Sequence, residues 1–264
     1  MRRLLALLLA LILALPLTGC ARKASWRFEL DLRRDADDYT ARDGTLLSWY
    51  GWELPYLLLL SDDAAPGDEP PEELAAVRDA FNAETEACRE ALLREYHELE
   101  QLAVGDYVAN GAARFVPTGS HVEIAEAYRT ARLQSVRADG YADRGGAYPW
   151  RFVRAWSFDL ETGKIVAWYD LNDDPDALRA AIAAEITRQI RAQGMDAGFY
   201  DGWEETVGQL EGCEICMGAD ALTVIFGEQM LGPRAAGMPE FAIPYDAIAR
   251  YWNGYGRELM KKEG

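Results

Sequence analysis

The alternation of apolar and polar residues predicts strands in both halves of the chain. Apolar side chains alternate with charged ones over residues 26–33, which is typical of a half-buried strand. Within residues 45–60 the sequence predicts a second strand and then an apolar segment, whose conformation Pro55 leaves open. The clearest alternation covers residues 150–158, and a hairpin turn at residues 161–164 leads into a strand that pairs back.

Apolar residues at helical spacing predict a long helix and three later ones. The long helix runs to about residue 103 and follows the acidic, proline-rich loop at residues 61–73. Some 30 residues give it a length of roughly 45 Å. The later helices are predicted over residues 175–194, near 203–210, and from 247 to about 261.

Shorter apolar stretches predict five further strands, at residues 122–128, 133–136, 213–217, 221–227 and 240–243. The chain therefore reads as strands, a long helix, a strand meander, a helix and more strands. This order indicates an α+β fold with mostly antiparallel sheets. We expect one long helix in the N-terminal half and a second helix between the C-terminal strands.

The N-terminus carries an export signal. Arg2 and Arg3 precede an apolar run at residues 4–17, which is too short for a comfortable membrane span. The run ends in Leu17-Thr18-Gly19-Cys20, which resembles a bacterial lipobox. We expect a signal peptide at residues 1–19, lipid on the Cys20 thiol, and a tether at residues 20–24 on the extracytoplasmic face of the cell membrane. An ordinary secretory peptide with an incidental cysteine is the alternative.

Composition excludes several classes of function. The chain has 264 residues, 27 Lys and Arg, and 44 Asp and Glu, so its formal charge is −17. Removal of the signal peptide would make it 25 − 44 = −19. Such acidity argues against nucleic acid as a partner. With only His97 and His121, we expect no metal site and no cofactor.

The remaining cysteines leave several readings open. Cys88, Cys213 and Cys216 are an odd number, so one disulfide at most would leave a thiol free. Cys213 and Cys216 form a C-x-x-C pair, which occurs in redox motifs and in half of a zinc site. No thioredoxin-like context and no second ligand pair accompany it, so buried or locally bridged cysteines are favoured. A thiol protein remains a third class of function.

Several motifs in the C-terminal half resemble one family when they are taken in order. They are Leu133-Gln134-Ser135-Val136, Tyr141, Gly145-Gly146-Ala147, Phe158-Asp159-Leu160-Glu161-Thr162-Gly163-Lys164, Tyr169-Asp170-Leu171, Ala221-Leu222-Thr223-Val224-Ile225-Phe226, Gly237 and Phe241-Ala242-Ile243-Pro244-Tyr245. Together they are similar to the extracellular domain of RsiV-type anti-sigma factors. The N-terminal half resembles the companion domain that precedes the catalytic domain of PdaC-type peptidoglycan deacetylases. The resemblance implies domains at residues 25–120 and 121–264, packed as one unit.

The resemblance also implies a non-enzymatic, extracytoplasmic binding module. RsiV is a receptor for lysozyme, so lysozyme or a cell-wall glycan is the implied partner, beside the membrane itself. A strongly basic lysozyme would suit the acidic chain, although acidity also serves solubility. The sigma-binding segment, the spanning helix and the deacetylase's catalytic domain are not recognisable here. A peptidoglycan-acting envelope enzyme or accessory module is the alternative.

Six residues are candidates for ligand binding. Trp49 and Trp52 stand outside a clean alternation and are better candidates for an exposed aromatic surface than Trp150 and Trp156, although burial is favoured for them as well. Gly145 and Gly146 could shape a ligand loop, although a hairpin that needs positive φ is the favoured interpretation. Tyr148 follows them where the family often has His. Tyr245 belongs to the last family motif.

Two further pairs have a functional and a structural interpretation. Trp150 and Trp156 could stack on sugars, but their alternation with other aromatic residues favours the core. Asp159 and Glu161 could form a carboxylate pair for glycoside hydrolysis, but their place at a strand end favours a structural role in the turn.

The lipobox generates a direct prediction. Export of the full chain in a bacterium fed a clickable fatty acid should label the protein, and Cys20→Ala should remove the label because no thiol is left to carry the lipid. The modification is read by in-gel fluorescence, with Cys88→Ala as the matched control that keeps it. Equal labelling of the Cys20→Ala chain would contradict the lipobox.

Overall fold

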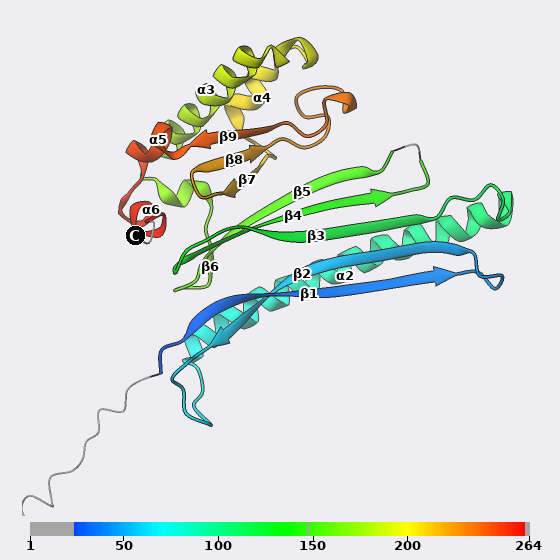
Figure 1. The fold of residues 1–264 in the computed structure, drawn as a ribbon, viewed down its shortest axis with the longest axis horizontal. Helices are drawn as coiled ribbons and strands as arrows, with labels where there is room; N and C mark the ends of the chain where they lie inside the picture. Colours follow the sequence, from blue (N-terminus) through cyan, green and yellow to red (C-terminus); the bar gives the residue numbers. More distant parts are fainter. Residues whose placement is uncertain (1–23, 147, 262–264) are drawn as a thin grey trace, which may run out of the picture.

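The computed structural model describes residues 24–146 and 148–261, and a six-stranded sheet is its largest element (Figure 1). The strands lie in chain order, as β1 (Arg27–Thr40), β2 (Leu46–Leu60), β3 (Thr118–Arg129), β4 (Leu133–Asp143), β5 (Trp150–Asp159) and β6 (Lys164–Ile165). Neighbours are antiparallel except β2 and β3, which are parallel. A parallel pair needs a long connection, and helix α2 (Glu72–Asn110) supplies it.

β2 and β3 separate soon after they meet. Their pairing begins at Ser48 and Thr118 and ends at Trp52 and Val122. Just beyond, a carboxylate oxygen of Glu53 accepts the Ile124 N–H at 2.8 Å, so a side chain replaces the next backbone contact. The second half of β2 therefore has an edge that β3 does not cover.

Side chains of α2 bond this free edge. The Asn82 side chain accepts the Leu57 N–H at 2.8 Å and donates to the Leu57 carbonyl at 3.1 Å, as a neighbouring strand would. The Thr85 hydroxyl donates to the Pro55 carbonyl at 2.8 Å. Proline lacks an N–H, and it is tolerated here because its nitrogen lies on the edge that has no strand partner. β2 therefore continues through Pro55 as one strand, which resolves the open question.

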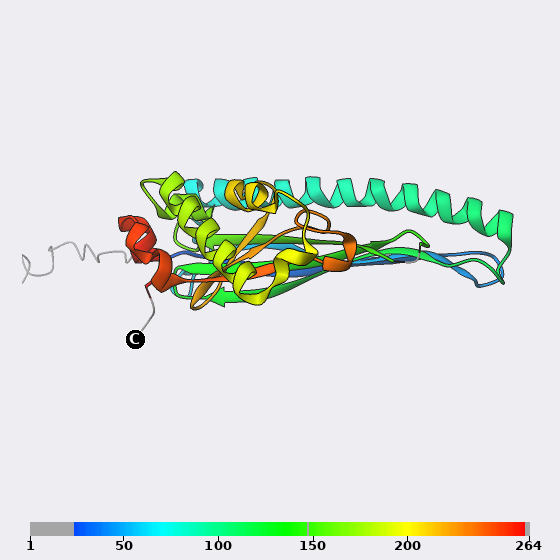
Figure 2. The ribbon, with the colours of Figure 1, turned by 90° about the horizontal axis from the view of Figure 1, so that it is seen from above.

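α2 is longer than the sequence predicted. Its 39 residues lie along one face of the sheet, seen edge-on in Figure 2, and give a length of about 58 Å. The Tyr56 hydroxyl donates to Glu86 at 2.5 Å, and Arg89 pairs with Asp35 at 2.5 Å. Tyr96 is buried against the aromatic side chains of β2. These contacts fix the helix to β1 and β2.

A C-terminal lobe, residues 166–261, packs beside β5 (Figure 1). It contains helices α3 (Pro175–Gln193), α4 (Trp203–Gln209), α5 (Tyr245–Ile248) and α6 (Gly254–Leu259), and an antiparallel sheet of β7 (Glu214–Met217), β8 (Ala221–Ile225) and β9 (Glu240–Pro244). Asp174 caps α3 through the Ala177 N–H, and Gly194 ends it in a left-handed conformation. The core of the lobe includes four α3 side chains one turn apart, Leu178, Ile182, Ile186 and Ile190.

The prediction of one continuous C-terminal helix at residues 247–261 is wrong, because the structure has separate short helices there. α5 is followed by a 3-10 turn, η4 (Ala249–Tyr251), and α6 begins only after Asn253. The Asn253 N–H donates to the Leu171 carbonyl, and its side chain caps α6 by accepting the Gly256 N–H. Asn253 therefore starts a new helix because its backbone is bonded outside the helix.

The α+β prediction is confirmed, including the long helix and a helix between C-terminal strands. The boundary predicted at residue 120 lies inside β3, and the two-domain division stays a prediction. The predicted signal peptide and Cys20 lie outside the described residues. Within residues 24–146 and 148–261, no helix is both long and apolar enough to cross a bilayer.

Candidate functional site

The separation of β2 from β3 leaves an apolar groove between α2 and the sheet. The groove has a volume of about 450 Å³. Its floor is formed by Val122, Ile124, Ala138, Phe152 and Trp156, which come from β3, β4 and β5. These residues share the sheet face that α2 covers, but α2 follows β2 and covers β5 only near Phe158, on which Phe81 packs. The groove is therefore a part of the apolar sheet face that the helix does not cover.

Acidic residues stand on the helix side of this groove. Glu84 and Glu95 line it from α2, are exposed, and have no ion-pair partner within 4 Å among the described residues. Cys88 lies between them and is also exposed. On the opposite wall Arg154 is paired with Glu214 of β7 at 2.6 Å. An apolar floor with free carboxylates on its rim suits a partner that is both apolar and basic.

A cleft separates the β4–β5 hairpin from the C-terminal lobe. It has a volume of about 620 Å³, and Tyr148, Arg151, Glu228 and Arg234 are among its lining residues. A neighbouring hollow of about 450 Å³ shares Tyr148 and Arg234, and adds Trp150. Arg234 joins the two sides, because its guanidinium donates to the Pro149 carbonyl at 2.5 Å and lies over the Tyr148 ring.

The structure brings some of the predicted binding residues together beside this cleft. Gly146 and Tyr148 line the neighbouring hollow, and Gly145 precedes them in the hairpin with φ of 74°. The Gly145 N–H donates to the Asp143 carboxylate, which shapes the turn. Their role as a ligand loop stays a prediction.

Trp49, Trp52 and Tyr245 lie elsewhere. Trp52 is 1% exposed and donates from its ring nitrogen to Ser120 at 2.6 Å, so it is not part of an exposed aromatic surface. Trp49 is half-buried, and its ring lies so close over Gly119 that a side chain there would clash. Tyr245 packs in the C-terminal lobe and donates to the Gly218 carbonyl at 2.7 Å.

The prediction that Trp150 and Trp156 are core residues is wrong for Trp150. That side chain is 49% exposed, whereas Phe158 on the same strand face is 1% exposed. Trp156 is half-buried in the groove. Alternation correctly predicted that the three side chains share a face, but it could not show where the cover over that face ends.

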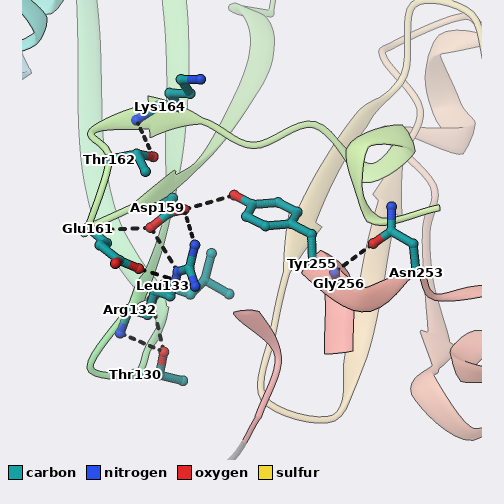
Figure 3. Close-up of polar contacts among 10 residues, drawn as sticks. All are labelled: Thr130, Arg132, Leu133, Asp159, Glu161, Thr162, Lys164, Asn253, Tyr255 and Gly256. Atoms are coloured by element: carbon teal, nitrogen blue, oxygen red, sulfur yellow. Dashed lines mark hydrogen bonds and ion pairs between the residues drawn. The ribbon is translucent and has the colours of Figure 1, made fainter. Parts of the chain in front are cut away.

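Asp159 is a structural carboxylate that ties the lobe to the sheet (Figure 3). It is fully buried and accepts two hydrogen bonds from Arg132, at 3.1 and 2.9 Å. The Tyr255 hydroxyl from α6 and the Glu161 N–H donate to it at 3.0 Å each. Burial works to raise the pKa of Asp159, but these donors outweigh it and hold the pKa below the ordinary value. The preference for a structural role over hydrolysis agrees with these contacts.

The cysteines of the C-x-x-C pair are both free thiols, as is Cys88. Cys213 donates to the Leu210 carbonyl at 3.0 Å, and burial raises its pKa to about 11. Cys216 contacts the Ser135 hydroxyl at 3.6 Å, and burial raises its pKa too. High pKa values oppose the thiolate form that redox and metal chemistry need.

The histidines lie apart from both hollows. His97 is exposed on α2, 3.5 Å from Glu100, and His121 lies on β3 beside the Tyr141 ring. In the described part of the chain, no group of three or more His, Cys, Asp or Glu side chains is placed to hold a metal ion.

Sequence reasoning missed the residues that complete the two hollows. Glu228 and Arg234 lie in a loop without periodicity, and they reach the cleft only because the lobe folds back on the hairpin. Phe152 was assigned to the strand, but its place in the groove depends on Gly140, whose missing side chain leaves room for the Phe152 ring. The sequence signal for this contact was Gly140, which pairs with Phe152 on the neighbouring strand.

Comparison with known proteins gives the fold. No model of a protein family and no curated protein sequence matches the chain. A solved structure of a DUF3298 family member from Bacteroides fragilis NCTC 9343 matches with a TM-score of 0.62 and 14% identity, covering 91% of this chain and 100% of that one. A DUF3298 family protein from Pseudomonas aeruginosa PAO1 matches with a TM-score of 0.53 and 11% identity, covering 89% and 98%.

The chain has the DUF3298 fold. At these identities the likeness concerns the fold alone, and the function of the domain is unknown. The resemblance to RsiV agrees with a DUF3298-type domain, and its finer claim of an RsiV-like receptor stays a prediction.

The thiol environments predict an uneven reaction with Ellman's reagent. In the unanchored chain, defined as residues 20–264 with Cys20→Ala, one thiol should react rapidly at pH 8 because Cys88 is exposed. Cys213 should react slowly, since a pKa of about 11 leaves roughly one thiolate in a thousand, and buried Cys216 should also react slowly. Denaturation without reductant should release all three. Only one thiol after denaturation would instead reveal a disulfide.

The Asp159 network predicts a pH-dependent loss of stability. Asp159→Asn should lower the free energy of unfolding by about 2–4 kcal/mol at pH 7, because it removes a buried charge that Arg132 and Tyr255 share. The carboxylate's contribution is complete above its unfolded pKa of about 3.9 and is lost as pH falls through the lower folded pKa.

Urea denaturation between pH 3 and pH 7 measures this effect. The difference between the native chain and Asp159→Asn should shrink at the acidic end, because the Asp159 carboxyl of the unfolded chain takes up a proton there before that of the folded chain does. Asp173→Asn is the matched control, because that side chain is exposed. A difference that is constant with pH would contradict the assigned role of the charge.

Proposed function

We propose that the chain is a non-catalytic binding module of the cell envelope and that its partner is a cationic protein, with lysozyme as the leading case. The distribution of charge supports this proposal. Residues 24–117 have 21 acidic and 8 basic side chains, so their net charge is 8 − 21 = −13, whereas residues 118–261 have 22 and 14, giving 14 − 22 = −8. The part that forms β1, β2 and α2 is the more acidic part, and it would steer a basic protein towards itself.

The groove is the proposed contact point, where α2 of this acidic part meets β3, β4 and β5. Its floor of half-buried and buried apolar side chains can receive an apolar side chain of the partner. Glu84 and Glu95 can then pair with basic groups around that anchor. The resemblance to RsiV favours lysozyme among cationic proteins.

Lipid on Cys20 would hold the module near the membrane. A lysozyme that is captured there is removed from the cell wall, so binding alone would protect the cell without a signalling step. The alternative is a peptidoglycan-acting enzyme. Neither the groove nor the cleft offers such an enzyme an imidazole, since His97 and His121 lie elsewhere.

The proposal predicts saturable binding of a C-type lysozyme by the unanchored chain. At roughly physiological ionic strength the complex should form, and it should persist in weakened form at 0.5 M salt because the groove contributes apolar contact. Glu84→Lys with Glu95→Lys should weaken binding by about tenfold or more, since two attractions become repulsions. Ala91→Trp, which fills the groove from α2, should weaken it comparably. Calorimetric titration measures each affinity.

Matched controls separate the groove from general charge. Glu211→Lys with Glu258→Lys makes the same change in net charge at exposed positions of the C-terminal lobe. Ala109→Trp places the same bulk on an exposed position of α2. Both controls should bind like the native chain. Equal loss in the charge controls would mean non-specific attraction, and no binding by the native chain would refute lysozyme as the partner.

A further inference from the structure

The cleft between the β4–β5 hairpin and the C-terminal lobe is lined by opposite charges in equal number. The basic side chains are Arg137, Arg151 and Arg234, and the acidic ones are Asp139, Glu228 and Glu240. Arg137 is already bonded to both Asp139 and Glu240, at 2.7 to 2.8 Å. Arg151 has no ion-pair partner in the part of the chain that the structure describes. The balanced lining does not favour a strongly charged ligand, but it offers many hydrogen-bond donors and acceptors to a neutral one.

Glu228 is the polar group in this cleft that lacks a full set of partners. Its side chain is 7% exposed, and one carboxylate oxygen is buried without a hydrogen bond among the described residues. The nearest cation, Arg234, is 3.6 Å away, which is longer than a hydrogen bond. A buried carboxylate oxygen without a donor is costly, so groups of this kind often mark a place where a ligand or water donates.

Exposed aromatic side chains line the hollow that adjoins the cleft. Tyr148 is 73% exposed and Trp150 is 49% exposed, and both line the hollow that adjoins the cleft. Arg234 lies 5.7 Å from the centre of the Tyr148 ring, and it connects this hollow to the cleft. Exposed rings beside a polar hollow offer flat apolar faces, against which the C–H faces of sugar rings pack.

We propose that this cleft binds a short neutral oligosaccharide. One ring of the sugar stacks on Trp150 or Tyr148 in the adjoining hollow. The oligosaccharide then passes Arg234 into the cleft, where a hydroxyl group donates to Glu228 and Arg151 donates to a sugar oxygen. This site is separate from the groove of the proposed function and takes a different class of ligand. The two proposals therefore stand or fall independently.

The test uses the unanchored chain and a printed array of neutral and acidic oligosaccharides, followed by titration of chitotriose, maltotriose and the strongest array ligand. Lysozyme is left out because it binds chitotriose itself. Binding should be confined to neutral glycans and should change the intrinsic tryptophan fluorescence. Trp150→Ala and Glu228→Gln should each weaken it by about tenfold or more, and Tyr169→Ala, an exposed tyrosine elsewhere, should not.

Thermal unfolding of each variant shows whether a loss of binding comes from misfolding. Trp150→Ala should keep the melting temperature of the native chain because its side chain is half in solvent, so its result stands even if Glu228→Gln destabilises the cleft. Preferential binding of acidic glycans or of inorganic phosphate would overturn the proposal in favour of an anion site. Absence of binding on the whole array would also overturn it, as would neutral binding that Trp150→Ala leaves unchanged.

Discussion

The unpaired backbone edge of β2 is the constraint on which the rest of the structure depends. Buried peptide groups must be hydrogen-bonded, and β3 leaves β2 after Trp52. Asn82 and Thr85 of α2 bond that edge instead, which places the helix beside β2 and not over the middle of the sheet. The apolar face of β4 and β5 consequently stays partly open. The groove exists because the helix completes the edge of a strand.

Two hollows with different chemistry follow from this arrangement and from the attachment of the C-terminal lobe. The groove joins an apolar floor to the acidic surface of α2, which suits a basic protein. The cleft and its neighbouring hollow combine balanced charges with exposed aromatic rings, and they meet where Arg234 contacts the β4–β5 hairpin. Asp159 fixes the lobe at the other end of β5 through Tyr255. The proposed protein-binding surface and the proposed small-ligand surface thus lie on different parts of one sheet.

Much of the fold could be predicted because its elements are locally specified. Asp174 and Gly194 bound α3 as helix caps do, and the alternation over β5 reports its two faces. The candidate site could be predicted only in part, since Gly146 and Tyr148 lie in the hairpin that carries the motif. Trp52 was misplaced because its burial depends on α2, and Trp150 because its exposure depends on where that cover ends. Arg234 and Glu228 reach the cleft through long-range packing, which periodicity does not encode.

Hydrogen–deuterium exchange of the unanchored chain, with and without a C-type lysozyme, tests most directly whether the groove is the binding surface. We expect added protection of backbone amides in the part of α2 that carries Glu84 and Glu95 and in β5 around Phe152 and Trp156. The C-terminal lobe should exchange as it does in the free chain. Protection confined to the lobe, or to the sheet face opposite α2, would contradict the account.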